Sequence, residues 1–172
     1  MKPEKLSDIK KELTGRSAQE LAEICLRMAR YKKENKELLN FLLFDSDDPL
    51  LFAEKVKTFL DEDFKVIQKQ YYYSTKSLRK ILRLMNRYVK YTGNKQVEIE
   101  LYLWFCSNFL IYTDLNTSHK PLQGLLIRQL EKISKLLPKL HEDLQFDYQG
   151  EFENLIHKAD GKAKWISKSL YL

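Results

Sequence analysis

The chain has 172 residues and a formal net charge of +6, and it contains only 5 glycines and 4 prolines beside 9 phenylalanines and 10 tyrosines. Glycine and proline make up about 5% of the residues against an average of about 12%, so an all-β sandwich or barrel would lack the residues that its turns require. The same composition excludes collagen-like and low-complexity chains, while a hydrophobic fraction of 44% suffices for one packed domain.

The N-terminal segment predicts a short helix within residues 1–16. Pro3 stands ahead of an apolar-periodic run, at the favoured first helical position, and Gly15 ends that run. Charged residues are frequent here and no long apolar run follows, so we expect no secretory signal and a cytoplasmic chain. Ser17 and Glu20 match the S-x-x-E capping box, which predicts a second helix from Ala18.

A polar stretch at residues 32–37 either continues this second helix or bends it before the apolar stripe resumes. Residues 45–48 then predict a turn and an N-cap, and Pro49 begins a helix of about five turns. The pattern breaks at residues 71–75, where Ser74 or Thr75 is the expected cap of the next helix.

That next helix is predicted from about Lys76 to Tyr91, closed by Gly93 and Asn94. Residues 97–103 alternate between apolar and polar, as a strand does, but the apolar run continues for about 18 residues and therefore favours a helix. Its charge-free part, residues 101–113, is shorter than the roughly 20 residues that cross a bilayer, and we expect a buried core helix and no membrane span.

The C-terminal part predicts a helix at residues 122–137, opened by Pro121 and interrupted at Pro138, and a last helical segment within residues 150–172. The whole chain therefore predicts one all-α domain over residues 1–172, with six or seven helices of 12 to 20 residues. Short loops favour antiparallel helical hairpins, stacked as a small α-solenoid or as an irregular bundle. The absence of an internal repeat leaves a HEAT- or armadillo-like superhelix as an analogy only.

Cys25 and Cys106 each have core-like neighbours and neither has a C-x-x-C partner. A chain of this length can fold without a disulfide bond, so we expect two structural thiols.

Positive charge is concentrated in one segment. No acidic residue lies between Asp63 and Glu98, whereas nine cations do. They are Lys65, Lys69, Lys76, Arg79, Lys80, Arg83, Arg87, Lys90 and Lys95. Of 30 lysines and arginines, 21 remain elsewhere against 24 acidic residues, so the rest of the chain has a balance of −3.

Helical spacing arranges these cations in stripes. Five of them fall within about 80° on one face of the predicted helix, opposite its apolar face. This first stripe consists of Lys76, Lys80, Arg83, Arg87 and Lys90. A second stripe consists of Arg128, Lys132, Lys135 and Lys139. If the helices alternate between two layers, one intervening helix puts both stripes in the same layer, and they would share a face.

Three interpretations of the stripes remain open. The cations are solvated or paired with acidic residues such as Asp61, Glu62, Asp63 and Glu98, or they bind an acidic protein partner, or they bind nucleic acid without sequence preference. For nucleic acid, five flanking tyrosines could stack on bases: Tyr71, Tyr72, Tyr73, Tyr88 and Tyr91. Our leading hypothesis is a non-enzymatic interaction or scaffold module that binds an acidic protein. The candidate binding residues are Lys76, Arg79, Lys80, Arg83, Arg87, Lys90, Arg128, Lys132 and Lys135.

Motifs for catalysis are missing from the sequence. It has no Walker, dinucleotide-binding, nucleophile-elbow or H-E-x-x-H motif, so we predict no catalytic residue, cofactor or metal. The weakest alternative is a metal-assisted hydrolase in the acidic region 141–157, where Glu153 and His157 stand four residues apart. A solvated acidic connector, interrupted at Gly150, is the favoured interpretation of that region.

Three strings carry a resemblance: YKKENKELLNFLLF from Tyr31, SLRKILRLMNRYVKYTG from Ser77 and LHEDLQFDY from Leu140. Over roughly residues 17–150 the chain resembles a small family of all-helical bacterial proteins of the Bacteroides and Cytophaga kind. The resemblance implies a cytoplasmic bacterial helical protein and assigns no activity or site residue.

Overall fold

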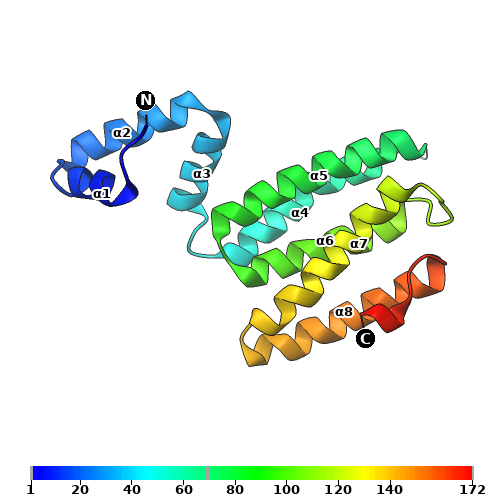
Figure 1. Cartoon of the computed structure of the whole chain (residues 1–172). Coiled ribbons are helices and arrows are strands. Elements are labelled where there is room, and N and C mark those ends of the chain that lie inside the picture. The colour runs from blue at the N-terminus through cyan, green and yellow to red at the C-terminus, as the bar shows by residue number, and fades with distance from the viewer. Residues whose placement is uncertain (1, 69, 172) are drawn as a thin grey trace. The chain divides into compact units, whose positions relative to one another are not determined.

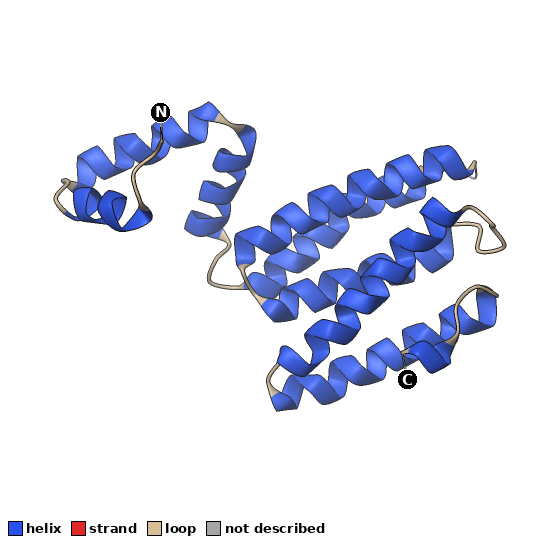
Figure 2. Cartoon of the chain, in the orientation of Figure 1, coloured by secondary structure: helices blue, strands red, loops and turns tan. Residues whose placement is uncertain are grey.

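A computed structural model describes residues 2–68 and 70–171 of the chain. These residues form eight α-helices and two short 3₁₀ turns, and no strand occurs among them (Figure 2). The predicted all-α fold is confirmed. The chain divides into two compact units, residues 1–46 and 47–172. A single domain over residues 1–172 stays a prediction.

The first unit contains α1 (Leu6–Thr14), α2 (Ala18–Tyr31) and α3 (Lys33–Phe44). Pro3 lies before α1 and does not begin it, which corrects that expectation. The capping box at the start of α2 is confirmed: the Glu20 amide donates to Ser17 Oγ at 3.3 Å, and the Ser17 amide donates to the Glu20 carboxylate at 2.8 Å. The polar stretch bends the chain, because Lys32 is extended between two helices.

Packing in this first unit buries little apolar surface. Helices α2 and α3 pack against each other, yet α1 and α2 contain no buried residue and α3 buries Phe41 alone. Cys25 is exposed on α2, so the expected core position is wrong for this thiol. The apolar stripes of these three short helices are partly left in contact with solvent.

The second unit contains α4 (Pro49–Lys65), α5 (Tyr71–Thr92), α6 (Lys95–Tyr112), α7 (Lys120–Leu136) and α8 (Glu142–Lys162). Asp48 caps α4, since its carboxylate accepts a hydrogen bond from the Leu51 amide at 2.9 Å. Gly93 ends α5 in the left-handed conformation, with φ of 57°, and Asn94 caps α6. The predicted boundaries at Pro49 and Gly93 are confirmed.

Two predicted helix starts in this unit need correction. Helix α5 begins at Tyr71, and Ser74 and Thr75 lie buried inside it with their hydroxyls donating to the Tyr71 carbonyl. Helix α8 begins at Glu142 and runs through Gly150, because its buried face continues on both sides of the glycine. The described residues form eight helices of 9 to 22 residues rather than six or seven of 12 to 20, since the break at Lys32 divides one predicted segment into α2 and α3.

Helix α6 is the centre of the second unit. It is apolar on most of its circumference, as the long apolar run predicted, and it packs against α4, α5, α7 and α8. Helices α5 and α7 pack side by side on one side of it, and Figure 1 shows them in front of α4 and α6. The unit is thus a two-layer stack of helical hairpins. Within the described residues, no helix is long and apolar enough to cross a membrane.

Candidate functional site

Four cationic residues of α5, together with the start of α7, line one groove. Its volume is about 670 Å³. The cationic side chains that line it are Lys76, Arg79, Lys80 and Arg83, and none of its lining residues is acidic. We call it the α5–α7 groove.

The loop between α6 and α7 contacts the first turn of α5 and completes the groove. Tyr71 donates a hydrogen bond from its hydroxyl to the Asp114 carboxylate at 2.9 Å, and its ring stacks on His119 at 6.1 Å between centroids. The hydrogen bond to Asp114 raises the pKa of the Tyr71 hydroxyl. His119 and Pro121 thereby line the groove together with the α5 cations.

His119 is the groove residue that sequence reasoning missed. Its Nδ1 atom is buried and has no hydrogen-bond partner among the described residues. Nothing in the local sequence singles it out, because its position depends on stacking against a tyrosine far away in the chain. Tyr72, by contrast, belongs to the tyrosine group that was considered for stacking, and it lines the groove with 66% of its surface exposed.

Some candidate cations already have acidic partners. Lys80 forms an ion pair with Asp63 at 2.8 Å, and Lys65 pairs with both Asp61 and Glu62 at 2.8 Å. Lys76, Arg79 and Arg83 are exposed and form no ion pair with the described part of the chain. The acid-free segment is therefore neutralised in part, and three unpaired cations remain in the groove. Lys69 lies outside the described residues.

The rest of the first stripe lies beyond the groove. The Arg87 guanidinium stands 5.5 Å from the Tyr88 ring, and Tyr88 packs edge-on against Phe52 and Phe59 of α4. Lys90 is exposed in the last turn of α5. Tyr88 and Tyr91 are packed against each other, so these two tyrosines are half-buried packing residues in the structure.

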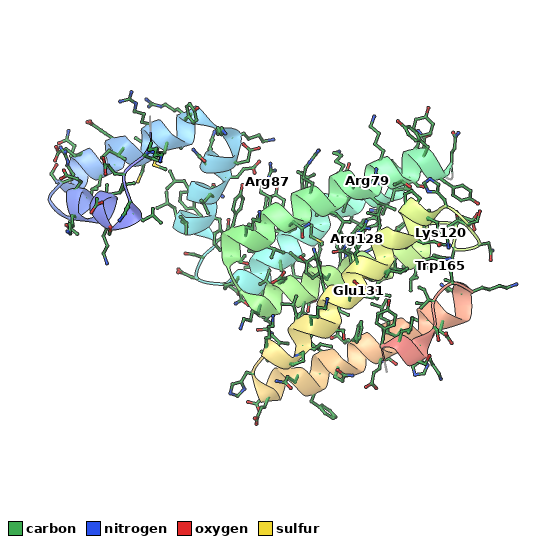
Figure 3. All side chains as sticks on the ribbon, viewed as in Figure 1. Arg79, Arg87, Lys120, Arg128, Glu131 and Trp165 are labelled. Carbon is green, nitrogen blue, oxygen red and sulfur yellow. The ribbon has the colours of Figure 1, made fainter. Side chains whose placement is uncertain are left out.

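The second stripe follows α7. Figure 3 labels Arg79 and Arg87 on α5 and Lys120 and Arg128 on the neighbouring α7. A Cβ atom at Gly124 would stand 3.1 Å from the Arg128 guanidinium, so this side chain lies back along α7 toward its N-terminus. Lys132 instead contacts Tyr102, with its ammonium 4.9 Å from the ring, and Lys135 is exposed.

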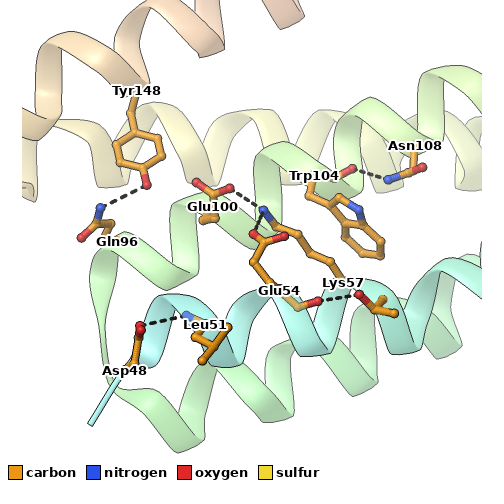
Figure 4. A network of polar contacts seen from close by, with 10 residues as sticks. Asp48, Leu51, Glu54, Lys57, Gln96, Glu100, Trp104, Asn108 and Tyr148 are labelled. Atoms are coloured by element: carbon orange, nitrogen blue, oxygen red, sulfur yellow. Dashed lines mark hydrogen bonds and ion pairs between the residues drawn. The ribbon is translucent and has the colours of Figure 1, made fainter. Parts of the chain in front are cut away.

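A second polar cluster joins α4 to α6, and a separate contact joins α6 to α8 (Figure 4). Lys57 forms ion pairs with Glu54, at 2.7 Å, and with Glu100. Burial opposes the charge on Lys57, but the two carboxylates outweigh it and raise its pKa. One turn before Glu100, on the same face of α6, the Gln96 amide donates to the Tyr148 hydroxyl at 3.3 Å. In the Lys57 cluster one ammonium is shared by two carboxylates, and it links α4 to α6.

Glu153 and His157 lie on the same continuous helix, one turn apart and both exposed. Glu153 accepts a hydrogen bond from Gln149 at 2.9 Å. In residues 2–68 and 70–171, no three histidine, cysteine or acidic side chains are grouped so that they could hold a metal ion.

Comparisons with protein families, with curated proteins and with solved structures found no match to this chain.

Proposed function

We propose that this protein is a non-enzymatic interaction module that binds an acidic segment of a partner protein in the α5–α7 groove. The observation that carries the proposal is the set of three unpaired cations, Lys76, Arg79 and Arg83, in a groove without an acidic lining residue. Arginine forms bidentate hydrogen bonds with carboxylates, and two arginines one turn apart on α5 suit neighbouring carboxylates of one segment.

The extent of the charge favours a short protein segment over a nucleic acid. Contact along a nucleic-acid strand needs a positive track over many residues. Beyond the groove, Arg87 contacts Tyr88 and Lys132 contacts Tyr102, so these two cations are engaged by the protein itself. A compact groove with an aromatic wall accommodates a few acidic side chains with an apolar residue between them.

Nucleic-acid binding is the second candidate because of Tyr72. An exposed aromatic ring beside unpaired cations is the combination that single strands use for stacking. The two candidates differ in salt dependence, since a strand that contacts several cations releases many counterions.

The experiment compares two labelled probes of equal charge, a glutamate-rich peptide and a single-stranded oligonucleotide, by fluorescence anisotropy. We expect the peptide to bind, and the variant R79E/R83E to weaken it at least about tenfold, the equivalent of 1.4 kcal/mol. The matched control is K158E/K162E, which makes the same change of charge at exposed positions of α8.

Two results would reject the protein-segment proposal. One is an equal loss in both variants, which would mean attraction by net charge alone. The other is binding of the oligonucleotide without the peptide, with affinity that falls steeply with salt, which would assign the groove to nucleic acid.

A further inference from the structure

Residues 1–46 carry an apolar groove that has no cover within this unit. It lies between α2 and α3 and has a volume of about 640 Å³. Leu26, Leu43 and Phe44 line it and are exposed, Phe44 by 76% of its surface. Several exposed apolar side chains in one place mark an interaction surface more often than isolated ones do.

The same groove is strongly cationic. Its lining includes Arg30, Lys32, Lys33 and Lys36 and no acidic side chain. Lys33 has an acidic partner on its own helix, the half-buried Glu37, whose carboxylate is 3.8 Å from the Lys33 ammonium. The groove therefore fits an occupant that combines a large apolar side chain with several carboxylates.

The beginning of α8 has these properties. Phe146 is 84% exposed, on the side of α8 opposite the buried Tyr148 and Leu155. One turn before it on the same face stand Glu142 and Asp143.

The acidic character extends along the helix. Residues 142–153 contain five acidic residues and no lysine or arginine. Gly150 lies one turn after Phe146, and apart from its chain neighbours and the backbone of its own helix no atom lies within 4 Å of the place of its missing Cβ. The ring of Phe146 thus stands on an open, acidic surface.

We propose that the α2–α3 groove of one molecule receives the first turns of α8 from a second copy of this chain. Phe146 packs against Leu43 and Phe44, and the carboxylates around it face Lys33 and Lys36. The contact joins two different surfaces, so two copies that exchange both contacts close a dimer, and copies that cannot do so form longer assemblies. This contact uses other residues than the α5–α7 groove and is independent of the function proposed for it.

Charge reversal on either surface tests the proposal, and a mixture of the two variants serves as the internal control. K33E/K36E cancels the net charge of the groove lining, from +4 to 0, and E142K/D143K changes residues 142–147 from −3 to +1, so each variant alone loses the attraction between the two surfaces. An equal mixture of the two keeps one native contact, and in the other contact the introduced carboxylates face the introduced ammonium groups. We expect the native chain to show a mass that rises with concentration in sedimentation velocity, each variant to stay monomeric, and the mixture to associate.

Two further variants complete the experiment. K10E/K11E changes the same charge at exposed positions of α1, and we expect it to associate as the native chain does. Phe146→Ser, at an exposed position away from the helix end, should weaken association at least about tenfold. A native chain that is monomeric at millimolar concentration overturns the proposal, and so does a mixture that fails to associate.

Discussion

The Lys80 ammonium lies 2.8 Å from Asp63 Oδ1 and joins the first half of α5 to the end of α4. Lys80 also lines the α5–α7 groove, so this ion pair partly neutralises the site that we propose for an acidic partner. The side chains are 53% and 28% exposed, which makes the pair a surface interaction with a small effect on stability.

Asp63→Asn should therefore strengthen binding of the acidic peptide. The substitution frees the Lys80 ammonium, and one additional charge contact of about 1 kcal/mol corresponds to roughly fivefold in affinity. The free energy of unfolding should fall by no more than about 1 kcal/mol. Anisotropy titration and urea unfolding measure the two effects. Weaker binding in D63N would show that the carboxylate positions Lys80 for the ligand rather than competing with it.

The core of the second unit should depend strongly on Phe64. Its side chain is fully buried and contacts Trp104, Phe105 and Tyr112 at centroid distances of 5.2 to 6.0 Å. Phe64→Ala should lower the free energy of unfolding by about 3–5 kcal/mol, because it removes apolar contacts and leaves a cavity. Urea unfolding followed by tryptophan fluorescence reports on this unit, since both tryptophans, Trp104 and Trp165, belong to it.

The matched control for Phe64 is Phe59→Ala on the same helix. Phe59 is 58% exposed and contacts Tyr88 edge-on at 6.4 Å. We expect a loss of about 1 kcal/mol or less. Equal losses in the two variants would contradict the packing described for α4.

Helix boundaries were predictable where the chemistry is local. Three boundary signals act within a few residues, and the structure confirms each of them. They are the capping box at Ser17, the cap and proline at Asp48 and Pro49, and the left-handed glycine at Gly93. The same reasoning was wrong for Ser74 and Thr75. A hydroxyl that donates to a carbonyl one turn earlier has the same sequence signature as a cap, and only burial distinguishes the two.

The site was predictable in part. Periodicity alone put Lys76, Lys80 and Arg83 on one face of a helix, and all three line the groove. Whether each cation is free depends on tertiary contacts, such as Asp63 with Lys80 or Tyr102 with Lys132, which no local pattern contains. The position of His119 likewise depends on stacking between residues far apart in the chain.

Substitution of two glycines by alanine should have opposite effects on stability. Gly93→Ala should destabilise by about 1 kcal/mol, because its φ of 57° is unfavourable for a residue with a Cβ. Gly150→Ala should stabilise by about 0.5–1 kcal/mol, since it lies inside α8 with no atom within 4 Å of a new Cβ. Thermal unfolding measures both. A destabilising G150A would contradict a continuous α8.

Cys106 should make the second unit less stable in alkaline solution. Its thiol is fully buried in α6, and burial raises its pKa above the ordinary range. The folded state keeps the thiol neutral, while the unfolded chain releases the proton above a pH of about 8.5. Because only the unfolded state releases this proton, the free energy of unfolding falls as pH rises, by up to about 1.4 kcal/mol per pH unit.

Urea unfolding between pH 8 and 10, followed by tryptophan fluorescence, measures this effect. Burial raises the pKa of Tyr148 to about 12, so its contribution begins only near pH 10, where the unfolded tyrosine ionises. The small cavity left by Cys106→Ala lowers stability by an amount that does not depend on pH, whereas the loss of the ionisable thiol should make the pH dependence above 8.5 shallower. Cys25→Ala removes the exposed thiol and serves as the control, with a curve like that of the native chain. Identical slopes in C106A and the native chain would mean that Cys106 is accessible to water in the folded state.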